Sequence, residues 1–428
     1  MTKLLDNLAS DHPVAICGST QDTTTSLTRS EIAKQLRHLS CQRIALFSSN
    51  VAEIISLLCA TQLAQIDLVL LKQPLDMHPS SSIDAWRIDS EFSDGEVKRI
   101  SEPRVKGQGK IIITTSGTTG TPKAAEHKLE SLIGTIKYTP GLAHLRWLLT
   151  YAPASFAGIQ LILTSIICRG TLLSSHNGSV QELAEIALRE QPHNISATPT
   201  FWRSFLLTLG VQAKSISLKN ITIGGEAVDQ GLLDDLARTF PNAAITHIYA
   251  STEAGVVFSV KDMRAGFPSS WLTNGHRGTK LRISDNELQV LSPRRMLSYA
   301  DAKPNHANND NWLNTGDLVK VDIDRVYFAG RIDERINVGG TKVVPGKVES
   351  ALLSLDEVSD ARVFAQDNPI TGQIVAAEVV LKPGREGSES KRQIVYQLKQ
   401  TLDRAEVPRM IRIVEQITTN ATGKKIRK

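Results

Sequence analysis

The chain has 428 residues, of which 41% are hydrophobic and 22% are charged, and it carries a formal net charge of +5. This length exceeds one ordinary hydrophobic core, so we expect two or three domains. The composition excludes a disordered chain, while the pI near 8.9 leaves nucleic-acid binding open.

The sequence carries no signal for export or for a membrane span. Its amino terminus lacks the apolar core of a signal peptide, and no apolar run reaches the roughly 20 residues that a span needs. The four cysteines (Cys17, Cys41, Cys59 and Cys168) form no CxxC pair, which argues against a zinc site and a disulfide framework. We therefore expect a cytoplasmic protein.

Short apolar runs alternate with helix-like stretches through the first three hundred residues, and VAEIISLLCATQLAQ (51–65) is an amphipathic helix candidate. The predicted strands are RIALF (43–47), DLVLL (67–71), KIIITT (110–115), WLLTYAP (147–153), GTLLS (170–174), NISATP (194–199), ITIGG (221–225) and AITHIYAS (244–251). Strands that alternate with helices predict an α/β fold with a largely parallel sheet. Ligands bind such sheets beyond the carboxyl ends of the strands.

The pattern changes near Phe328. ELQVLSP (287–293) and LVKVDIDRVYFAG (318–330) predict short strands separated by turns. After Arg331, two helix candidates and two strand candidates predict a small α+β domain: GKVESALLSL (346–355), ARVFAQ (361–366), IVAAEVVL (374–381) and QIVYQLKQTL (393–402). We place the boundary at Arg331-Ile332-Asp333, which gives a large domain over 1–331 and a small domain over 332–428. Residues 72–109 predict loop and edge structure.

TTSGTTGTPKAAEH (114–127) directly follows a predicted strand. Glycines allow a ligand to approach the backbone, and amide and hydroxyl groups donate hydrogen bonds to anionic oxygens. The spacing from Gly117 to Gly120 and Lys123, without a Ser or Thr after the lysine, excludes a Walker A loop. Taken alone, the segment is equally compatible with a phosphate site and with a simple turn.

This segment resembles the STSGTTGxPK loop of the ATP-dependent acyl-adenylate-forming enzymes, which include acyl- and aryl-CoA synthetases, luciferase-like ligases and nonribosomal adenylation domains. Further segments resemble the motifs of this superfamily in the same order: Gly224–Glu226, Tyr249–Glu253 (with Ala250 in place of Gly), Asn314–Asp317, Gly330–Asp333, Asn337–Lys342 and Asn420–Lys424. The set is specific although most members are weak alone. The first hundred residues fit only loosely and are shorter than is usual in the superfamily.

The resemblance implies an ATP site. The residues for the β- and γ-phosphates are Thr115, Ser116, Gly117, Thr118, Thr119, Gly120 and Lys123. Gly225 and Glu226 lie on the adenine side, and Tyr249 stacks on the adenine. Thr252 touches the α-phosphate, Glu253 helps to hold Mg²⁺, Asp317 accepts the ribose hydroxyls, and Arg331 lies near ribose or phosphate. A carboxylate beside a triphosphate requires a divalent cation between them.

The resemblance also implies two catalytic conformations. Lys424 bridges the substrate carboxylate and the α-phosphate, because two anions can meet only with positive charge between them. Asp333 is the hinge, and Gly339 and Gly340 face the thiol in the second half-reaction. The implied fold is a large N-terminal domain of parallel-rich sheets, helices and a distorted β-barrel, followed by a small mobile C-terminal α+β domain.

The implied reaction is ATP-dependent activation of a carboxylic acid as acyl-AMP, followed by transfer to a thiol of coenzyme A or of a carrier protein's phosphopantetheine. Enzymes for α-amino acids carry Asp where this sequence has Ala157, and an anion is needed to pair with a buried ammonium group. We therefore expect an aryl or short acyl substrate. Candidate pocket residues are Phe156, Ala157, Thr198 and Gly224, with plain core packing left open for Phe156.

The thiol acceptor stays open at this point. The chain after Arg331 has 16 basic and 13 acidic residues, and this surplus suits either a separate acidic carrier protein or the phosphates of coenzyme A. Two other functions remain as alternatives. One is a non-catalytic nucleotide-binding member of the fold, which the presence of Lys424, Asp317 and Glu253 disfavours. The other is a nucleic-acid-binding protein, suggested by the pI and the KKIRK tail. We rank this function below the first alternative and expect no nucleic-acid partner.

Overall fold

The computed structural model describes residues 16–17, 43–48, 50–71, 86–88, 97–99, 108–115, 123–136, 140–175, 178–300, 312–385, 387–419 and 424–426. Residues 116–120 of the predicted phosphate loop and residues 420–423 of the terminal motif lie outside this set. Within the described part, no helix is both long and apolar enough to cross a membrane.

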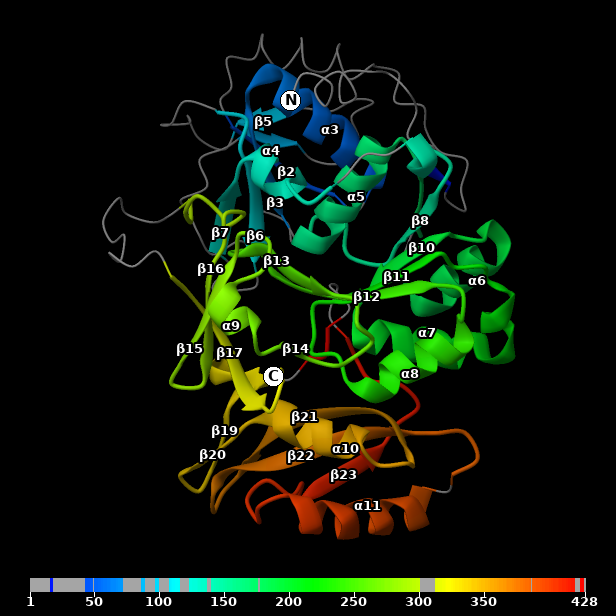
Figure 1. Ribbon diagram of the computed structural model, residues 1–428, viewed down its shortest axis with the longest axis vertical. Helices are drawn as coiled ribbons and strands as arrows, with labels where there is room; N and C mark the ends of the chain where they lie inside the picture. Colours follow the sequence, from blue (N-terminus) through cyan, green and yellow to red (C-terminus); the bar gives the residue numbers. More distant parts are fainter. Residues whose placement is uncertain are drawn as a thin grey trace.

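A six-stranded mixed sheet occupies the amino-terminal end of the molecule (Figure 1). Its strand order is β5-β4-β2-β3-β6-β7, and the central neighbours are parallel. DLVLL is buried along its whole length, as expected for a strand covered on both faces. The elements are β2 (Arg43–Phe47), α3 (Val51–Ala64), β3 (Asp67–Leu71), β4 (Trp86–Ile88), β5 (Val97–Arg99), β6 (Ile111–Thr115), β7 (Lys123–His127) and α4 (Leu129–Ile133).

A seven-stranded sheet follows, in the order β1-β9-β8-β10-β11-β12-β13, and only its last pair is antiparallel. Helices α6, α7 and α8 cover one face, and their apolar residues form one core with the strands. The elements are β1 (Ile16–Cys17), η2 (Pro140–Leu142), β8 (Arg146–Leu149), α5 (Phe156–Cys168), β9 (Thr171–Leu173), α6 (Val180–Glu190), β10 (Asn194–Ala197), α7 (Pro199–Leu209), η3 (Gly210–Ser215), β11 (Asn220–Gly224), α8 (Gln230–Thr239), β12 (Ala244–Ser251) and β13 (Gly255–Val260).

A curled antiparallel sheet completes the large domain, in the order β14-β18-β17-β16-β15. Arg325 is 1% exposed there and donates to three backbone carbonyls and to Asp262. The elements are β14 (Phe267–Pro268), α9 (Trp271–Asn274), β15 (Lys280–Ser284), β16 (Glu287–Leu291), β17 (Leu313–Asp322) and β18 (Arg325–Arg331).

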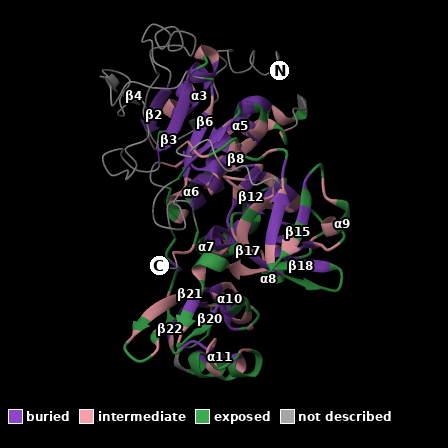
Figure 2. Cartoon of the chain, turned by 90° about the vertical axis from the view of Figure 1, so that its left-hand side faces the viewer, coloured by how far each residue is buried: buried purple, intermediate pink, exposed green. Residues whose placement is uncertain are grey.

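The small C-terminal domain contains its own sheet, in the order β20-β19-β22-β21 with β23 added beside β22. Its buried side chains form a separate hydrophobic core (Figure 2). The elements are η4 (Ile332–Glu334), β19 (Ile336–Val338), β20 (Thr341–Val343), α10 (Pro345–Leu353), β21 (Val358–Asn368), β22 (Gly372–Leu381), α11 (Gly387–Thr401) and β23 (Met410–Ile413).

The predicted α/β fold class, with a large and a small domain, is confirmed, and each strand run quoted above coincides with an observed strand. Several strands were not predicted from the sequence, among them β7, β13, β15 and β23. KAAEH (Lys123–His127) returns antiparallel to β6 as β7, and residues near Ser298 bind its other edge through the backbone. β18 ends at Arg331 and β19 of the next sheet begins at Ile336. The boundary at Arg331-Ile332-Asp333 stays a prediction.

Candidate active site

Tyr249 and Asp317 meet between the seven-stranded sheet and the curled sheet. Tyr249 lies near the end of β12, where its ring packs against Phe258 and Phe328 at centroid distances of 5.2 and 4.8 Å. Its hydroxyl donates to Oδ2 of Asp317 at 2.5 Å. Burial, and then the Asp317 charge, raises the pKa of Tyr249 well above its usual value, so the phenol stays protonated as a donor.

Arg331 connects Asp317 to the segment between the domains. Its Nη1 donates to Oδ1 of Asp317 at 2.9 Å, and its Nε donates to Oδ1 of Asp333 at 3.0 Å. Burial raises the pKa of Asp317, while Arg331, Tyr249 and Lys424 oppose that rise. The predicted ribose carboxylate therefore lies in a partly buried position, paired with Arg331 and within the electrostatic influence of Lys424.

Lys424 of the small domain reaches the turn after β11 in the large domain. A methyl group at Gly225 would lie 3.3 Å from Cε of Lys424 and 3.4 Å from Cγ2 of Thr198. Gly225 has a φ of +88°, a conformation that other residues rarely adopt. Figure 1 shows the red carboxyl-terminal segment running from the small domain to this turn. The predicted catalytic lysine and the predicted adenine-side turn are thus in contact.

The same turn lies at the carboxyl ends of three parallel strands. Thr198 follows β10 and caps α7 by accepting a hydrogen bond from the Phe201 amide. Gly224 is the last residue of β11 and pairs with Ile248 of β12. The strands β10, β11 and β12 are parallel neighbours, so these residues gather at one sheet edge, where ligands bind α/β sheets.

The carboxylate of Glu226 is occupied by protein groups. Its Oε2 accepts from the amide and the hydroxyl of Thr200 at 3.1 and 2.7 Å, and its Oε1 accepts from the backbone amide of Lys425 at 3.0 Å. Glu226 therefore joins the two domains in this conformation. A nucleotide-binding role for its side chain stays a prediction.

Glu253 and Lys123 lie beside Tyr299. The Tyr299 hydroxyl donates to Oε1 of Glu253 at 3.1 Å, and Nζ of Lys123 lies 5.3 Å from the centre of the Tyr299 ring. The backbone of Met296 donates to Glu253, and Tyr299 forms a bridge with Ala125 of β7. This strand-like segment brings the predicted metal residue to the end of the predicted phosphate loop.

Glu253 suits a Mg²⁺ ion that is shared with a substrate. Among the described residues, no group of three or more His, Cys, Asp or Glu side chains could hold a metal by itself. Mg²⁺ usually keeps several waters and binds through one or two carboxylates together with substrate phosphates. A partly exposed carboxylate with one tyrosine donor fits that mode.

Phe156 and His127 pack together on the side of Thr252 and Glu253. Their ring centroids are 5.8 Å apart. His127 is fully buried, and among the described residues neither ring nitrogen has a partner with good hydrogen-bond geometry. Burial lowers its pKa to about 4, although the Thr252 backbone and the Glu253 charge act in the opposite direction. His127 is therefore neutral at pH 7. Ala157 follows Phe156 in the first turn of α5 and is half-buried.

The structure does not bring Gly339 and Gly340 to Lys424. Gly339 lies in the turn between β19 and β20, and its amide binds the Thr371 carbonyl within the small domain. Figure 1 shows this hairpin at the edge of the small domain, apart from the red carboxyl-terminal segment. Thr115 ends β6, whereas Ser116, Gly117, Thr118, Thr119 and Gly120 lie outside the described residues.

Four residues at or near the site were missed by the sequence analysis: His127, Tyr299, Asp360 and Lys425. Lys425 directly follows the terminal motif, so its position was a signal that could have been used. Asp360 and Tyr299 belong to no motif quoted above, and His127 is the last residue of the segment 114–127. Only the packing of distant segments shows the relation of these three residues to the site.

The comparison with protein families agrees with this geometry. A model described as AMP-binding enzyme matches residues 23–297, and one described as AMP-binding enzyme C-terminal domain matches residues 347–424. Solved structures share the fold. o-Succinylbenzoate CoA synthetase (MenE) from Bacillus subtilis is 20% identical with a TM-score of 0.67, and MatB from Rhodopseudomonas palustris is 18% identical with a TM-score of 0.73. Each match covers 99% of this chain and 96% of the other.

Curated relatives are similar over shorter lengths. A 3-[(3aS,4S,7aS)-7a-methyl-1,5-dioxo-octahydro-1H-inden-4-yl]propanoyl:CoA ligase from Rhodococcus jostii is 31% identical over 55% of this chain and 47% of its own length. 4-Coumarate–CoA ligase 4 from Arabidopsis thaliana is 24% identical over 82% of this chain and 66% of its own length. The chain thus covers less than two thirds of either relative. Because the AMP-binding model matches more than half of the residues, the chain belongs to the AMP-binding enzyme family.

Proposed function

We propose that this protein activates a carboxylic acid with ATP as an acyl-adenylate and then transfers the acyl group to a thiol. The observation that carries the proposal is the meeting of Lys424 with the Gly225 turn, at the edge of the sheet and near Asp317. This contact joins the small domain to the large domain at the predicted adenine-side turn. The names of the similar curated proteins, which include several CoA ligases, support the same reaction class.

In the first half-reaction, the substrate carboxylate attacks the α-phosphorus of ATP, and pyrophosphate leaves. Lys424 contacts both anions and stabilises the negative charge that develops between them. Asp317 accepts hydrogen bonds from the ribose hydroxyls, and Tyr249 packs on the adenine. Thr252 binds the α-phosphate. Thr115, the loop over 116–120 and Lys123 hold the β- and γ-phosphates.

Glu253 would hold Mg²⁺, which supplies positive charge to the triphosphate when it is bound. Tyr299 orients the Glu253 carboxylate by donating to one of its oxygens. Burial, and then Glu253, raises the pKa of Tyr299, so the phenol remains a donor over the physiological range.

The present arrangement suits the first half-reaction, because Lys424 is at the site and the turn at Gly339 and Gly340 is away from it. For thiol transfer, the small domain rotates about Asp333. This rotation removes Lys424 from the site and brings the turn at Gly339 and Gly340 into it. In the present arrangement Asp333 accepts from Arg331, so a rotation there would break or rearrange that ion pair.

We propose an aryl or short acyl acid as the substrate. Position 157 is alanine and offers no carboxylate to pair with an α-ammonium group. Phe156 is 8% exposed and packs on the neutral His127, which gives this side of the site an apolar wall. Thr198 and Gly224, at the carboxyl ends of β10 and β11, are the other proposed pocket residues. We propose coenzyme A as the acceptor, with a separate carrier protein as the alternative.

The test is acid-dependent exchange of labelled pyrophosphate into ATP over a panel of aryl, short acyl, long acyl and amino acids. We expect exchange with an aryl or short acyl acid and its loss in Lys424→Ala. Exchange only with amino acids would overturn the substrate class. Unchanged exchange in the variant would remove Lys424 from the chemistry. Product analysis with coenzyme A and with a phosphopantetheinylated carrier then identifies the acceptor.

A further inference from the structure

Lys425, the neighbour of the proposed catalytic lysine, forms a nearly buried ion pair with Asp360 of β21. Its Nζ donates to Oδ1 of Asp360 at 2.8 Å and to the Ala361 carbonyl at 2.5 Å. Each of the two charged side chains is 5% exposed. Desolvation of two charges is costly unless the pair is well placed, so this buried pair beside the proposed catalytic lysine calls for an explanation.

We infer that Lys425 and Asp360 are positioning residues, which hold the terminal segment so that Lys424 points into the active site during acyl-adenylate formation. This inference rests on the proposed function, and it adds a role for two residues outside the motifs of the sequence. Neither residue contacts the reacting atoms in this role.

The local backbone geometry supports the inference. Lys425 forms an antiparallel bridge with Thr419, and the carbonyl of Ile426 accepts from Nη1 of Arg362 at 2.8 Å. In β geometry, successive side chains point to opposite sides of the backbone. When Lys425 points into the small domain towards Asp360, Lys424 is directed the other way, towards Gly225.

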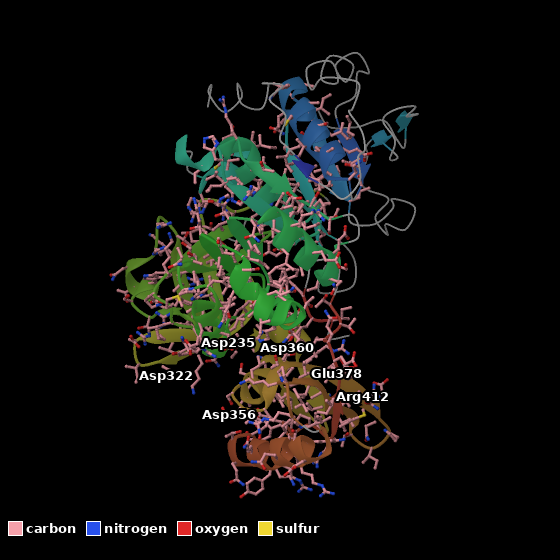
Figure 3. The ribbon with its side chains drawn as sticks, turned by 90° about the vertical axis from the view of Figure 1, so that its right-hand side faces the viewer. Asp235, Asp322, Asp356, Asp360, Glu378 and Arg412 are labelled. Atoms are coloured by element: carbon pink, nitrogen blue, oxygen red, sulfur yellow. The ribbon has the colours of Figure 1, made fainter. Side chains whose placement is uncertain are left out.

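The large domain completes the arrangement. Glu226 accepts from the Lys425 amide, and Nη1 of Arg203 lies 4.0 Å from Oδ1 of Asp360. Arg203 also pairs with Asp229 at the start of α8. Figure 3 shows the labelled Asp360 at the junction of the two domains, below the green helices of the large domain.

The two sets of contacts differ in what happens when the domains rotate. The pair between Lys425 and Asp360 lies within the small domain and moves with it. The contacts of Glu226 and Arg203 cross the domain boundary and exist only while Lys424 faces the large domain. Loss of the positioning pair should therefore impair the first half-reaction and spare the second.

The experiment measures the two half-reactions separately in Lys425→Met, Lys425→Arg and Asp360→Asn. The first is acid-dependent pyrophosphate exchange, and the second is thiol transfer from a preformed acyl-adenylate supplied to the enzyme. We expect exchange in Lys425→Met and Asp360→Asn to fall by about tenfold or more, because small misplacements of a reacting group are costly. Thiol transfer should stay within about twofold of the native rate. Lys425→Arg keeps the charge and should recover most of the exchange.

Lys347→Met is the matched control, because Lys347 forms an ion pair with Glu406 inside the same domain at 2.6 Å. It should leave both half-reactions unchanged. Exchange within about twofold of native in both test variants would overturn the inference, and so would an equal loss in both half-reactions, which would indicate a purely structural role. If Lys425→Met does not fold, Asp360→Asn, which keeps the side-chain volume, decides alone. Absence of exchange in the native protein would instead refute the proposed function.

Discussion

A methyl group on Gly225 would approach Cε of Lys424 to 3.3 Å, although the two residues belong to different domains and lie nearly two hundred positions apart in the chain. This separation is shorter than most real contacts of a β-carbon. Gly225 therefore leaves room for the end of the Lys424 side chain beside the adenine-side turn. Its φ of +88° adds a second reason for glycine.

We predict that Gly225→Ala displaces Lys424 and lowers acid-dependent pyrophosphate exchange by about tenfold. The left-handed backbone adds a loss of about 1–2 kcal/mol in the free energy of unfolding. Gly384→Ala is the matched control, because Gly384 has a φ of +83° and open space around its β-carbon position. The control should show the stability loss alone. Equal exchange rates in the two variants would show that Gly225 does not position Lys424.

Tyr249→Phe tests the hydroxyl that fixes Asp317. The variant keeps the ring packing against Phe258 and Phe328 but removes the donor to Oδ2 of Asp317. Loss of a hydrogen bond to this partly buried carboxylate should raise the KM for ATP by about tenfold, with a smaller change in kcat. Steady-state kinetics with varied ATP provide the measurement. An unchanged KM for ATP would argue against Asp317 as a ribose acceptor that Tyr249 orients.

The strands that were predicted from the sequence are short apolar runs bounded by turn residues. DLVLL is one example, and its burial along the whole length follows from its place inside a parallel sheet. β7 was harder to predict from the sequence. KAAEH contains two charged residues and one histidine, and its strand conformation depends on pairing with β6 and with the segment near Ser298.

The site was predictable where a residue type is tied to a motif, as for Asp317, Tyr249 and Lys424. The partners of those residues were not predictable. Asp360 is an ordinary acidic residue in a strand, and its relation to Lys425 arises from packing between segments about 65 positions apart. Tyr299 and His127 likewise lie at the site because of strand pairing, which the local sequence around them does not predict.

Arg325 is a buried arginine whose expected role is structural. Its guanidinium donates to the carbonyls of Arg264, Ala265 and Gly266 and pairs with Asp262 at 2.6 Å. Arg325→Met should lower the free energy of unfolding by about 3–5 kcal/mol, because it leaves these acceptors without their donor. Urea denaturation gives the value. Arg331→Met, at a more exposed position, should cost less stability and more activity. A larger stability loss in Arg331→Met than in Arg325→Met, or a larger activity loss in Arg325→Met, would contradict this division of roles.

His127 should make the protein sensitive to acid. In the folded chain burial lowers its pKa to about 4, whereas the unfolded chain protonates near 6.5. As the pH falls from 6.5 towards 4, the unfolded state binds a proton that the folded state does not bind, so stability is lost across this pH range. Below it, both states are protonated and the loss is complete. A pKa shift of this size corresponds to a loss of about 3 kcal/mol in the free energy of unfolding.

We therefore predict that His127→Gln shows a flatter dependence of the free energy of unfolding on pH between 6.5 and 4 than the native protein does. Urea denaturation at several pH values gives the two curves. His144→Gln, at an exposed position, should follow the native curve. If His127→Gln also follows the native curve, another group must cause the acid sensitivity. His127 would then bind a proton equally well in the folded and unfolded states. If the curves separate as expected, the apolar wall beside Phe156 contains a neutral imidazole, in keeping with an uncharged acyl group in this part of the site.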